Sequence, residues 1–165
     1  MGWFFKRKPE LVVVRAQSPD LPAMADIHAR SFAKSWNEDE IARLISGKGV
    51  DCFVVRTHGA GNGEPGGFLI LREAADEAEI ITIATDPAMR RLGIGRALMG
   101  HAIRHLHGDR IARLFLEVSE NNAPAVTLYR SLGFRQVGTR KGYYAATASA
   151  GDAAASALVM ELDLR

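Results

Sequence analysis

A strand that runs into a glycine-containing turn and then into a helix is the feature that most constrains the fold of this sequence. Residues 79–85 form an isoleucine- and threonine-rich run typical of a strand, and Asp86-Pro87 ends it because proline cannot donate to a β ladder. The turn, residues 90–96, reads Arg-Arg-Leu-Gly-Ile-Gly-Arg, and a helical pattern follows it. A second strand and helix, residues 113–118 and 124–132, repeat this order. Two such units favour parallel pairing within an α/β sheet.

The remaining segments complete one α/β domain. Asn37 and Glu40 have the spacing of a helix N-cap and its reciprocal acceptor. Four glycines and a proline within residues 59–66, followed by Gly67, predict a flexible loop between two strands. Expected strands are 11–14, 52–55, 68–71, 79–85, 113–118, 134–139 and 157–164, and expected helices begin at Asp20, at Asn37, after Gly95 (ending at about His107) and at Pro124. This order indicates a single three-layer domain over residues 11–165, with a mixed central sheet and helices on both faces, after a tail of residues 1–10.

Length and composition exclude several classes of protein. The 165 residues suit one domain, and 47% hydrophobic with 24% charged residues is typical of globular rather than fibrous or disordered chains. The net charge of +2 gives no reason to expect direct nucleic-acid binding. Cys52 is the single cysteine, which excludes an internal disulfide and an all-cysteine metal site. No apolar run reaches the roughly eighteen residues that span a bilayer, so we expect a cytoplasmic protein without membrane contact.

The turn at residues 90–96 is suited to binding a phosphate group. Backbone N–H groups at the start of a helix and the helix dipole both favour a negative charge there. Gly93 and Gly95 let a ligand approach the main chain, and arginines at both ends of the turn supply cations. The dinucleotide fingerprint and the Walker loop both fail, because Leu98 stands where a third glycine is needed and no Gly-Lys-Ser/Thr occurs. The alternative is a glycine-rich turn with solvated arginines.

Glu117 and Tyr129 are candidates for acid–base chemistry. In strand 113–118, side chains alternate between faces, and a carboxylate among apolar residues needs a partner or water, which makes Glu117 a candidate base. The alternative is a glutamate near a strand end that pairs with an arginine. Tyr129 lies on the apolar stripe of its helix and could instead be a core tyrosine. Asn122, before Pro124, could be a simple helix cap.

Two other reactive side-chain types have plain structural interpretations. His101 and His105 lie four residues apart on one helix, a spacing that can bind a metal, but no third ligand is evident and we expect no metal site. Cys52 lies among apolar residues and is expected to be a buried thiol rather than a nucleophile.

The motif Arg90-x-x-Gly93-x-Gly95 after a strand, with Asn122 and Tyr129 downstream, resembles the GNAT superfamily of acetyl-CoA-dependent N-acetyltransferases. The resemblance narrows to the RimI type, which acetylates the N-terminal alanine of a small-subunit ribosomal protein. It spans roughly residues 11–164, and the other segments that carry it are 79–87, 116–118, 128–134, Tyr143-Tyr144 and Ser35-Trp36.

This resemblance implies acetyl-CoA as co-substrate and a role for each motif residue. The backbone of residues 83–85 would pair with the pantetheine arm and the acetyl carbonyl. Glu117 would deprotonate the acceptor amine, directly or through water, and Tyr129 would protonate the departing CoA thiolate. The implied cofactor-binding residues are Ile83, Ala84, Thr85, Arg90, Arg91, Leu92, Gly93, Ile94, Gly95, Arg96 and Asn122, and the implied acceptor-site residues are Trp36, Tyr143 and Tyr144. No metal is expected.

The implied acceptor is a protein N-terminus, alanine above all, in a ribosomal protein. An α-amine with a pKa of about 8 is roughly one-tenth neutral at pH 7, whereas lysine at about 10.4 is neutral below about one part in a thousand. Ser119, Gly142, Ala145 and a long alanine-rich loop over 145–157 depart from the family pattern where the acceptor is expected. The alternatives are an acetyltransferase of lysine or small amines and a non-catalytic acyl-CoA-binding module. The presence of both an implied base and an implied acid argues against the module.

Overall fold

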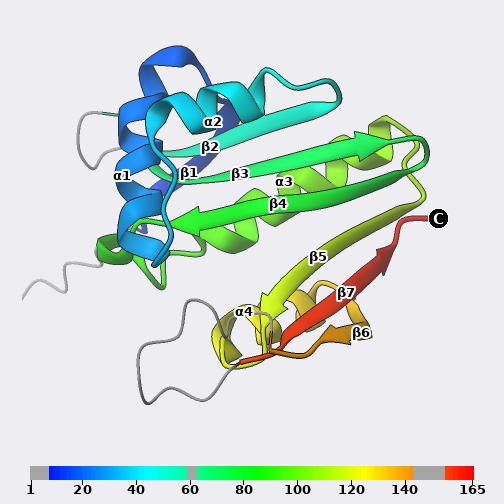
Figure 1. Ribbon diagram of the computed structural model, residues 1–165. Helices are drawn as coiled ribbons and strands as arrows, with labels where there is room; N and C mark the ends of the chain where they lie inside the picture. The colour runs from blue at the N-terminus through cyan, green and yellow to red at the C-terminus, as the bar shows by residue number, and fades with distance from the viewer. Residues whose placement is uncertain (1–7, 59–62, 143–154) are drawn as a thin grey trace, which may run out of the picture.

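The computed structural model describes residues 8–58, 63–142 and 155–165, whose strands form one seven-stranded sheet (Figure 1). The strands are β1 (Glu10–Arg15), β2 (Val50–His58), β3 (Pro65–Ala74), β4 (Glu77–Thr85), β5 (Arg113–Ser119), β6 (Arg135–Arg140) and β7 (Ala157–Asp163). Their order in the sheet is β1-β2-β3-β4-β5-β7-β6, and neighbours pair antiparallel except β4 with β5, which pair parallel. The expected mixed sheet is confirmed.

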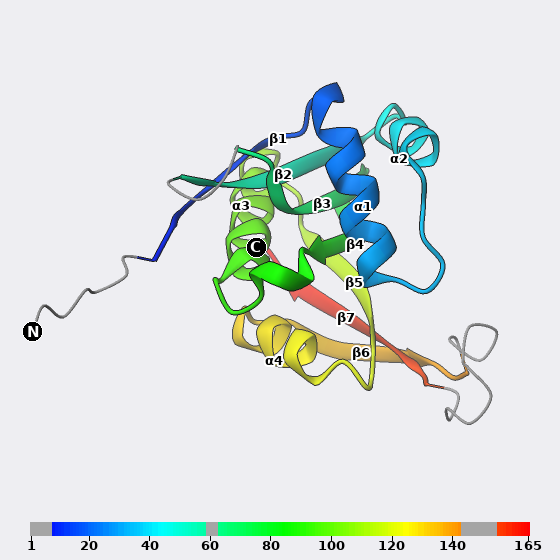
Figure 2. The same ribbon diagram turned by 90° about the vertical axis from the view of Figure 1, so that its left-hand side faces the viewer.

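Helices cover both faces of this sheet, as Figure 2 shows. The helices are α1 (Leu21–Ser31), α2 (Glu38–Ile45), α3 (Ile94–Gly108) and α4 (Ala123–Ser131). Alternate residues of β2 enter the two hydrophobic layers, because Cys52 and Val54 pack with α1 and α2 while Phe53 and Val55 pack with α3. The three-layer architecture predicted from the sequence is therefore present. None of the helices in the described residues is long and apolar enough to cross a membrane.

The start of α2 follows the predicted capping pattern. The side-chain oxygen of Asn37 accepts a hydrogen bond from the backbone N–H of Glu40 at 2.9 Å, and the Glu40 carboxylate accepts one from the Asn37 N–H at 2.8 Å. These two bonds satisfy backbone donors that the first turn of a helix leaves free. They fix the end of the segment 32–37, which connects α1 to α2.

Residues 65–67 correct the expectation of a flexible loop, because they form the first part of β3. A Cβ atom on Gly67 would lie 2.7 Å from Cγ2 of Ile94 and 2.8 Å from the carbonyl oxygen of Ala84. Glycine is therefore needed at position 67 so that β3 can pass under the first residue of α3. The close approach holds the start of α3 against the sheet.

The sheet opens between its two parallel strands. Pairing between β4 and β5 is confined to Glu77↔Arg113, Ala78↔Leu114 and Glu79↔Phe115. Beyond these three pairs β4 continues to Thr85 and β5 continues to Ser119 without a shared ladder, and the two ribbons diverge in Figure 1. We call this opening between the unpaired ends of β4 and β5 the wedge.

Candidate active site

The carboxyl ends of both parallel strands lead into helix starts beside the wedge. After β4, the side chain of Asp86 accepts a hydrogen bond from the Ala88 N–H at 2.9 Å and caps a short turn of 3₁₀ helix, Pro87–Met89. After β5, the Asn122 N–H donates to the Ser119 carbonyl at 3.0 Å, and α4 then begins. Ligands of open α/β sheets bind at this position, outside the carboxyl ends of parallel strands.

The turn before α3 has the backbone geometry of an anion cradle. Gly93 is the N-cap of α3 with φ of +82°, and apart from its own chain neighbours and helix backbone no atom of the described residues lies within 4 Å of the position that its Cβ would take. Arg91, two residues earlier, also has a positive φ, of +66°, which costs a non-glycine residue on the order of 1–3 kcal/mol. No side chain caps the first turn of α3, so its leading N–H groups are available to a ligand. The backbone geometry of the turn therefore suits an anion, and phosphate binding there stays a prediction.

The arginines of this turn differ in their contacts. Arg96 donates a hydrogen bond to the hydroxyl of Ser131 at 2.8 Å, which ties the start of α3 to the end of α4. Arg90 and Arg91 are exposed and form no ion pair within the described residues. Their guanidinium groups are therefore free to meet a phosphate.

Asn122 performs the structural role that was its alternative interpretation. Its side-chain oxygen accepts a hydrogen bond from the Ala125 N–H at 3.3 Å and caps α4. The packing of α4 on α3 is close, because a Cβ on Gly95 would lie 3.3 Å from Cδ2 of Leu128. The structure therefore brings Asn122 and the phosphate turn to neighbouring helix starts.

Glu117 lies on β5 and is paired with an arginine. The Nε atom of Arg140, at the end of β6, lies 3.0 Å from a carboxylate oxygen of Glu117. The glutamate side chain is 30% exposed. Glu117 therefore has both the partner and the solvent access that an ionised carboxylate in a strand requires. The ion pair was the plain alternative for this residue, and it leaves one face of the carboxylate open.

Tyr129 is buried on α4, with 6% of its surface exposed, and its ring packs against Phe134 with 5.8 Å between ring centres. Burial raises the pKa of Tyr129 to about 12, because a phenolate would lose its hydration. The hydroxyl forms no hydrogen bond with the described part of the chain. It therefore stays protonated and has a hydrogen to donate.

The predicted pantetheine-binding residues form the last three positions of β4. They pair with β3 on one side, as Ile83↔Leu69, Ala84↔Phe68 and Thr85↔Gly67. On the other side they border the wedge, where β5 provides no ladder partner. Buried backbone groups need hydrogen-bond partners, so this edge can pair with an extended amide-containing ligand.

Of the three residues predicted to bind the acceptor, the structure describes Trp36. Trp36 is half-buried between α1 and α2, and its indole stacks on the imidazole of His28 with 4.6 Å between ring centres and 14° between planes. The backbone N–H of Trp36 also donates a hydrogen bond to Nδ1 of His28, at 3.1 Å. Tyr143 and Tyr144 lie outside the described residues.

His28 is a functional candidate that the sequence analysis missed. It is 3% exposed, and burial lowers its pKa, so the imidazole is neutral and Nδ1 can accept the Trp36 N–H. A histidine four residues before Phe32 on the same helix face was the available signal, and the two rings contact at 4.5 Å. His28 fixes the connection in which Trp36 lies.

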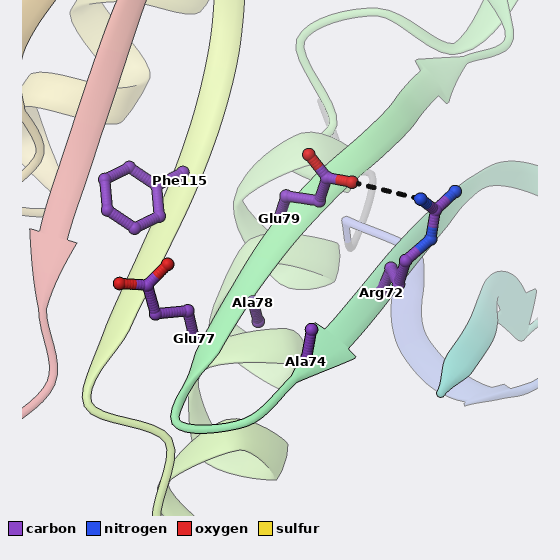
Figure 3. A pocket seen from close by; sticks show the side chains of 6 residues that line it. All are labelled: Arg72, Ala74, Glu77, Ala78, Glu79 and Phe115. Atoms are coloured by element: carbon purple, nitrogen blue, oxygen red, sulfur yellow. Dashed lines mark ion pairs between the residues drawn. The ribbon is translucent and has the colours of Figure 1, made fainter. Parts of the chain in front are cut away.

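A small pocket lies away from these residues (Figure 3). It has a volume of about 190 Å³ and is lined by Arg72, Ala74, Glu77, Ala78, Glu79 and Phe115. It is at the end of β4 where β4 and β5 still pair, at the opposite end from Thr85. Arg72 pairs with Glu79 at 3.5 Å, and Arg113 pairs with Glu77 and covers the Phe115 ring. The charged groups of this pocket neutralise one another, and none of its lining residues belongs to the predicted site.

The structure also describes Cys52 and His101, the two reactive side chains for which the sequence suggested plain structural roles. Cys52 is 2% exposed, and burial raises the pKa of its thiol to about 12, which confirms a buried thiol. His101 packs against the edge of the Phe53 ring, with 4.6 Å between ring centres, and among the described residues it lies outside the group that Asp51, Glu73 and His105 form.

Comparison with known proteins gives the family. Residues 21–134 match the acetyltransferase (GNAT) family. The ribosomal protein bS18-alanine N-acetyltransferase of Escherichia coli K12 is 36% identical over 146 residues, which cover 88% of this chain and 95% of that protein. The crystal structure of the ribosomal-protein-S18-alanine N-acetyltransferase from Escherichia coli has a TM-score of 0.81 at 34% identity, covering 94% of each chain. Arabidopsis thaliana NAA60, solved in complex with acetyl-CoA, shares the fold at 18% identity, with a TM-score of 0.78 over 93% of this chain and 98% of its own. The expected resemblance is therefore confirmed, and this chain belongs to the GNAT family of acetyltransferases.

Proposed function

We propose that this protein transfers the acetyl group of acetyl-CoA to the N-terminal α-amine of a protein, with the alanine of ribosomal protein bS18 as its acceptor. The observation that carries the proposal is the 36% identity over 88% of the chain to an enzyme named for that reaction. The geometry supports it through a wedge that accepts an amide-rich arm beside a helix start that accepts phosphate.

Residues on both sides of the wedge fit acetyl-CoA. The open N-cap at Gly93, together with the unpaired Arg90 and Arg91, suits the pyrophosphate. The unpaired edge of residues 83–85 suits the amides of the pantetheine arm, which binds there as an added strand would. Bound in this way, acetyl-CoA has its thioester near the end of β4. Leu92, Ile94, Gly95, Arg96 and Asn122 complete the proposed cofactor site.

Glu117 is the proposed base of the reaction. An ammonium has no lone pair, so its proton must leave before the nitrogen can attack the thioester carbonyl. Glu117 takes this proton directly or through a water molecule, and its exposed face gives the amine access. The Arg140 guanidinium, whose Nε lies 3.0 Å from a carboxylate oxygen of Glu117, keeps the other side of the carboxylate in place. Because about one-tenth of an α-amine is already neutral at pH 7, a weak base such as a carboxylate is sufficient to deprotonate it.

Tyr129 is the proposed acid. When the carbon–sulfur bond breaks, the CoA sulfur leaves as a thiolate and takes the hydroxyl hydrogen of Tyr129. The acylated nitrogen then gives up its surplus hydrogen as the amide forms, and this proton restores the tyrosine hydroxyl. With the tyrosine pKa at about 12 and an ordinary thiol at about 8.5, this transfer is uphill by roughly 5 kcal/mol. The same low-polarity surroundings raise the pKa of a nascent thiolate, as burial does at Cys52. A hydrogen bond from Tyr129 that strengthens as charge develops on sulfur is therefore the main contribution.

Trp36, Tyr143 and Tyr144 are the proposed acceptor-binding residues. Among them, the position of Trp36 is fixed by His28, which buries one face of the indole. A ring held in this way restricts the space beside the amine, which favours a small first residue such as alanine.

A pair of peptides tests the proposal. One carries the N-terminal sequence of bS18 with a free alanine, and the other is its N-capped copy with an internal lysine. Release of CoA with the first peptide and little release with the second is the expected result. Equal rates, or a faster rate with the capped peptide, would support acetylation of lysine or small amines instead. Binding of acetyl-CoA without turnover of any amine would support the non-catalytic module.

A further inference from the structure

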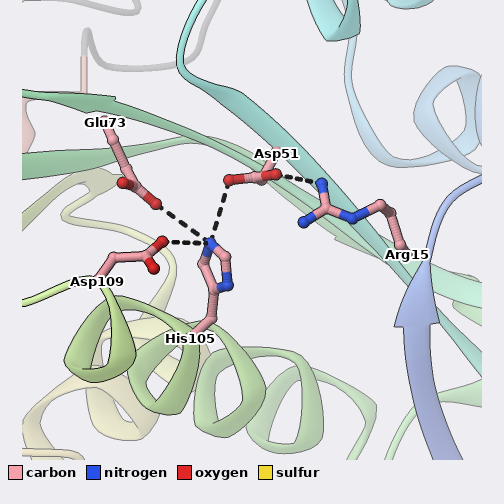
Figure 4. A network of polar contacts seen from close by, with 5 residues as sticks. All are labelled: Arg15, Asp51, Glu73, His105 and Asp109. Atoms are coloured by element: carbon pink, nitrogen blue, oxygen red, sulfur yellow. Dashed lines mark hydrogen bonds and ion pairs between the residues drawn. The ribbon is translucent and has the colours of Figure 1, made fainter.

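Three carboxylates surround one imidazole nitrogen near the end of α3, far from the wedge (Figure 4). Nε2 of His105 lies 3.1 Å from a carboxylate oxygen of Asp51, 3.1 Å from one of Glu73 and 3.3 Å from one of Asp109. The side chains of Asp51, Glu73 and His105 are only 19–21% exposed, and that of Asp109 is 49% exposed. The sequence analysis found no third ligand for His105 because the carboxylates come from β2 and β3, not only from its own helix.

The backbone holds these side chains in place before any ligand binds. Asp51 and Glu73 lie near the paired ends of β2 and β3, and the Glu73 N–H donates to the Gly49 carbonyl at 2.8 Å. Gly49 has φ of +74°, and a Cβ there would lie 2.5 Å from the Glu73 carbonyl oxygen. Only glycine permits this close turn, which fixes Glu73 against His105. The His105 ring is held from its other side by Phe53, with 5.2 Å between ring centres.

Hydrogen bonding within the group leaves its charge uncompensated. A ring nitrogen carries at most one hydrogen, so Nε2 cannot donate a full hydrogen bond to three oxygens. Arg15 pairs with Asp51, but through the other carboxylate oxygen. Three carboxylate oxygens lie within 3.1–3.3 Å of this one nitrogen, so negative charge is crowded there. A divalent cation bound between the four side chains in place of the shared proton would supply two positive charges instead of one.

We propose that His105, Asp51 and Glu73 bind one Zn²⁺ ion and that the exposed Asp109 carboxylate, which lies outside this close group, turns in as the fourth ligand. Zinc sites are tetrahedral with bonds of about 2.0–2.1 Å, so neighbouring ligand atoms are about 3.3–3.4 Å apart. The distances from Nε2 to the Asp51 and Glu73 oxygens, 3.1 Å each, are within about 0.3 Å of such an edge. Calcium and magnesium prefer oxygen ligands and more of them, so the imidazole favours zinc.

The site is structural rather than catalytic. Four protein ligands close the coordination sphere, as structural zinc sites do. The ligands join the last turns of α3 to β2 and β3, whereas the phosphate turn lies at the other end of α3, about 16 Å away along the helix. Zinc here would fasten the helix to the sheet and leave the chemistry of the wedge unchanged.

Isothermal titration of the tag-free, metal-stripped protein with Zn²⁺ tests this proposal. We expect one ion per chain, a higher melting temperature with zinc than with a chelator, and unchanged acetyl transfer. Glu73→Gln and Asp51→Asn keep the side-chain size and remove one ligand charge each. Each should weaken zinc binding by at least about tenfold and abolish the shift in melting temperature, with circular dichroism confirming the fold.

His107→Ala is the matched control, because His107 lies exposed on the same helix and outside the cluster. It should bind zinc as the unaltered protein does. The proposal is wrong if the unaltered protein binds no zinc, or if Glu73→Gln and Asp51→Asn bind it as tightly as His107→Ala does. These readouts do not depend on acetyl transfer, so they stand or fall separately from the proposed function.

Discussion

Replacing Gly93 by alanine should weaken acetyl-CoA binding far more than it weakens the fold. The residue has φ of +82°, and holding alanine in this left-handed conformation costs about 1–2 kcal/mol. For a domain of this size that lowers the melting temperature by about 2–8 °C. Beyond the adjacent backbone, the added methyl group meets no atom of the described residues within 4 Å. It can therefore interfere only with something that approaches from outside, namely the pyrophosphate.

Gly63→Ala separates the backbone cost from the exclusion of ligand. Gly63 has φ of +71° and no atom of the described residues within 4 Å of its Cβ position, but it lies in the connection between β2 and β3. Both variants should lose similar melting temperature. Calorimetry should show that only Gly93→Ala raises the Kd for acetyl-CoA, by about tenfold or more, which corresponds to at least about 1.4 kcal/mol. If Gly93→Ala and Gly63→Ala bind acetyl-CoA equally well, the turn is not the phosphate cradle.

Three further substitutions test the remaining assignments. Tyr129→Phe should bind acetyl-CoA normally but lower kcat by about 10²-fold, the low end for loss of an acid; an unchanged single-turnover rate would make Tyr129 a packing residue. Glu117→Gln should lower kcat/KM most at low pH, where less amine is neutral, and a parallel loss at every pH would contradict its role as base. His28→Phe should make the melting temperature fall less steeply as the pH decreases in the acidic range. Because burial lowers the folded pKa of His28, the unfolded chain takes up the proton first, and stability falls as pH drops below about 6.5. If the stability of the variant falls just as steeply with decreasing pH, His28 is not the group responsible for the loss of stability in acid.

Local patterns predicted the elements of this fold well. The capping pair Asn37 and Glu40 and the strand-ending Asp86-Pro87 act within one turn of the chain, and the structure places both as expected. The turn over residues 90–96 is local in the same sense, because Gly93 is the N-cap of α3 and Gly95 lies in its first turn. Each of these signals depends on neighbours in sequence, which a reader of the sequence can see.

Features that depend on tertiary packing were not predictable in this way. Gly67 was assigned to a loop by composition, but its role comes from the passage of Ile94 over β3. Glu117 and Arg140 meet because β7 lies between β5 and β6 in the sheet, an order that the sequence does not reveal. Spacing along one helix suggested a pairing of His101 with His105, whereas the groups that surround His105 come mostly from strands. Long-range register decides all three cases.

The single sheet consists of two parts, β1 to β4 and β5, β7 and β6, which only three residue pairs between β4 and β5 join. A short parallel ladder resists shear weakly, and the backbone amides along both sides of the wedge depend on solvent for their hydrogen bonds. In the free protein these amides should exchange with deuterium sooner than those inside the β2–β3 ladder. A ligand that lies in the wedge as an extra strand would protect these amides from exchange and stiffen the whole sheet. Acetyl-CoA would then be a part of the architecture as well as a reactant.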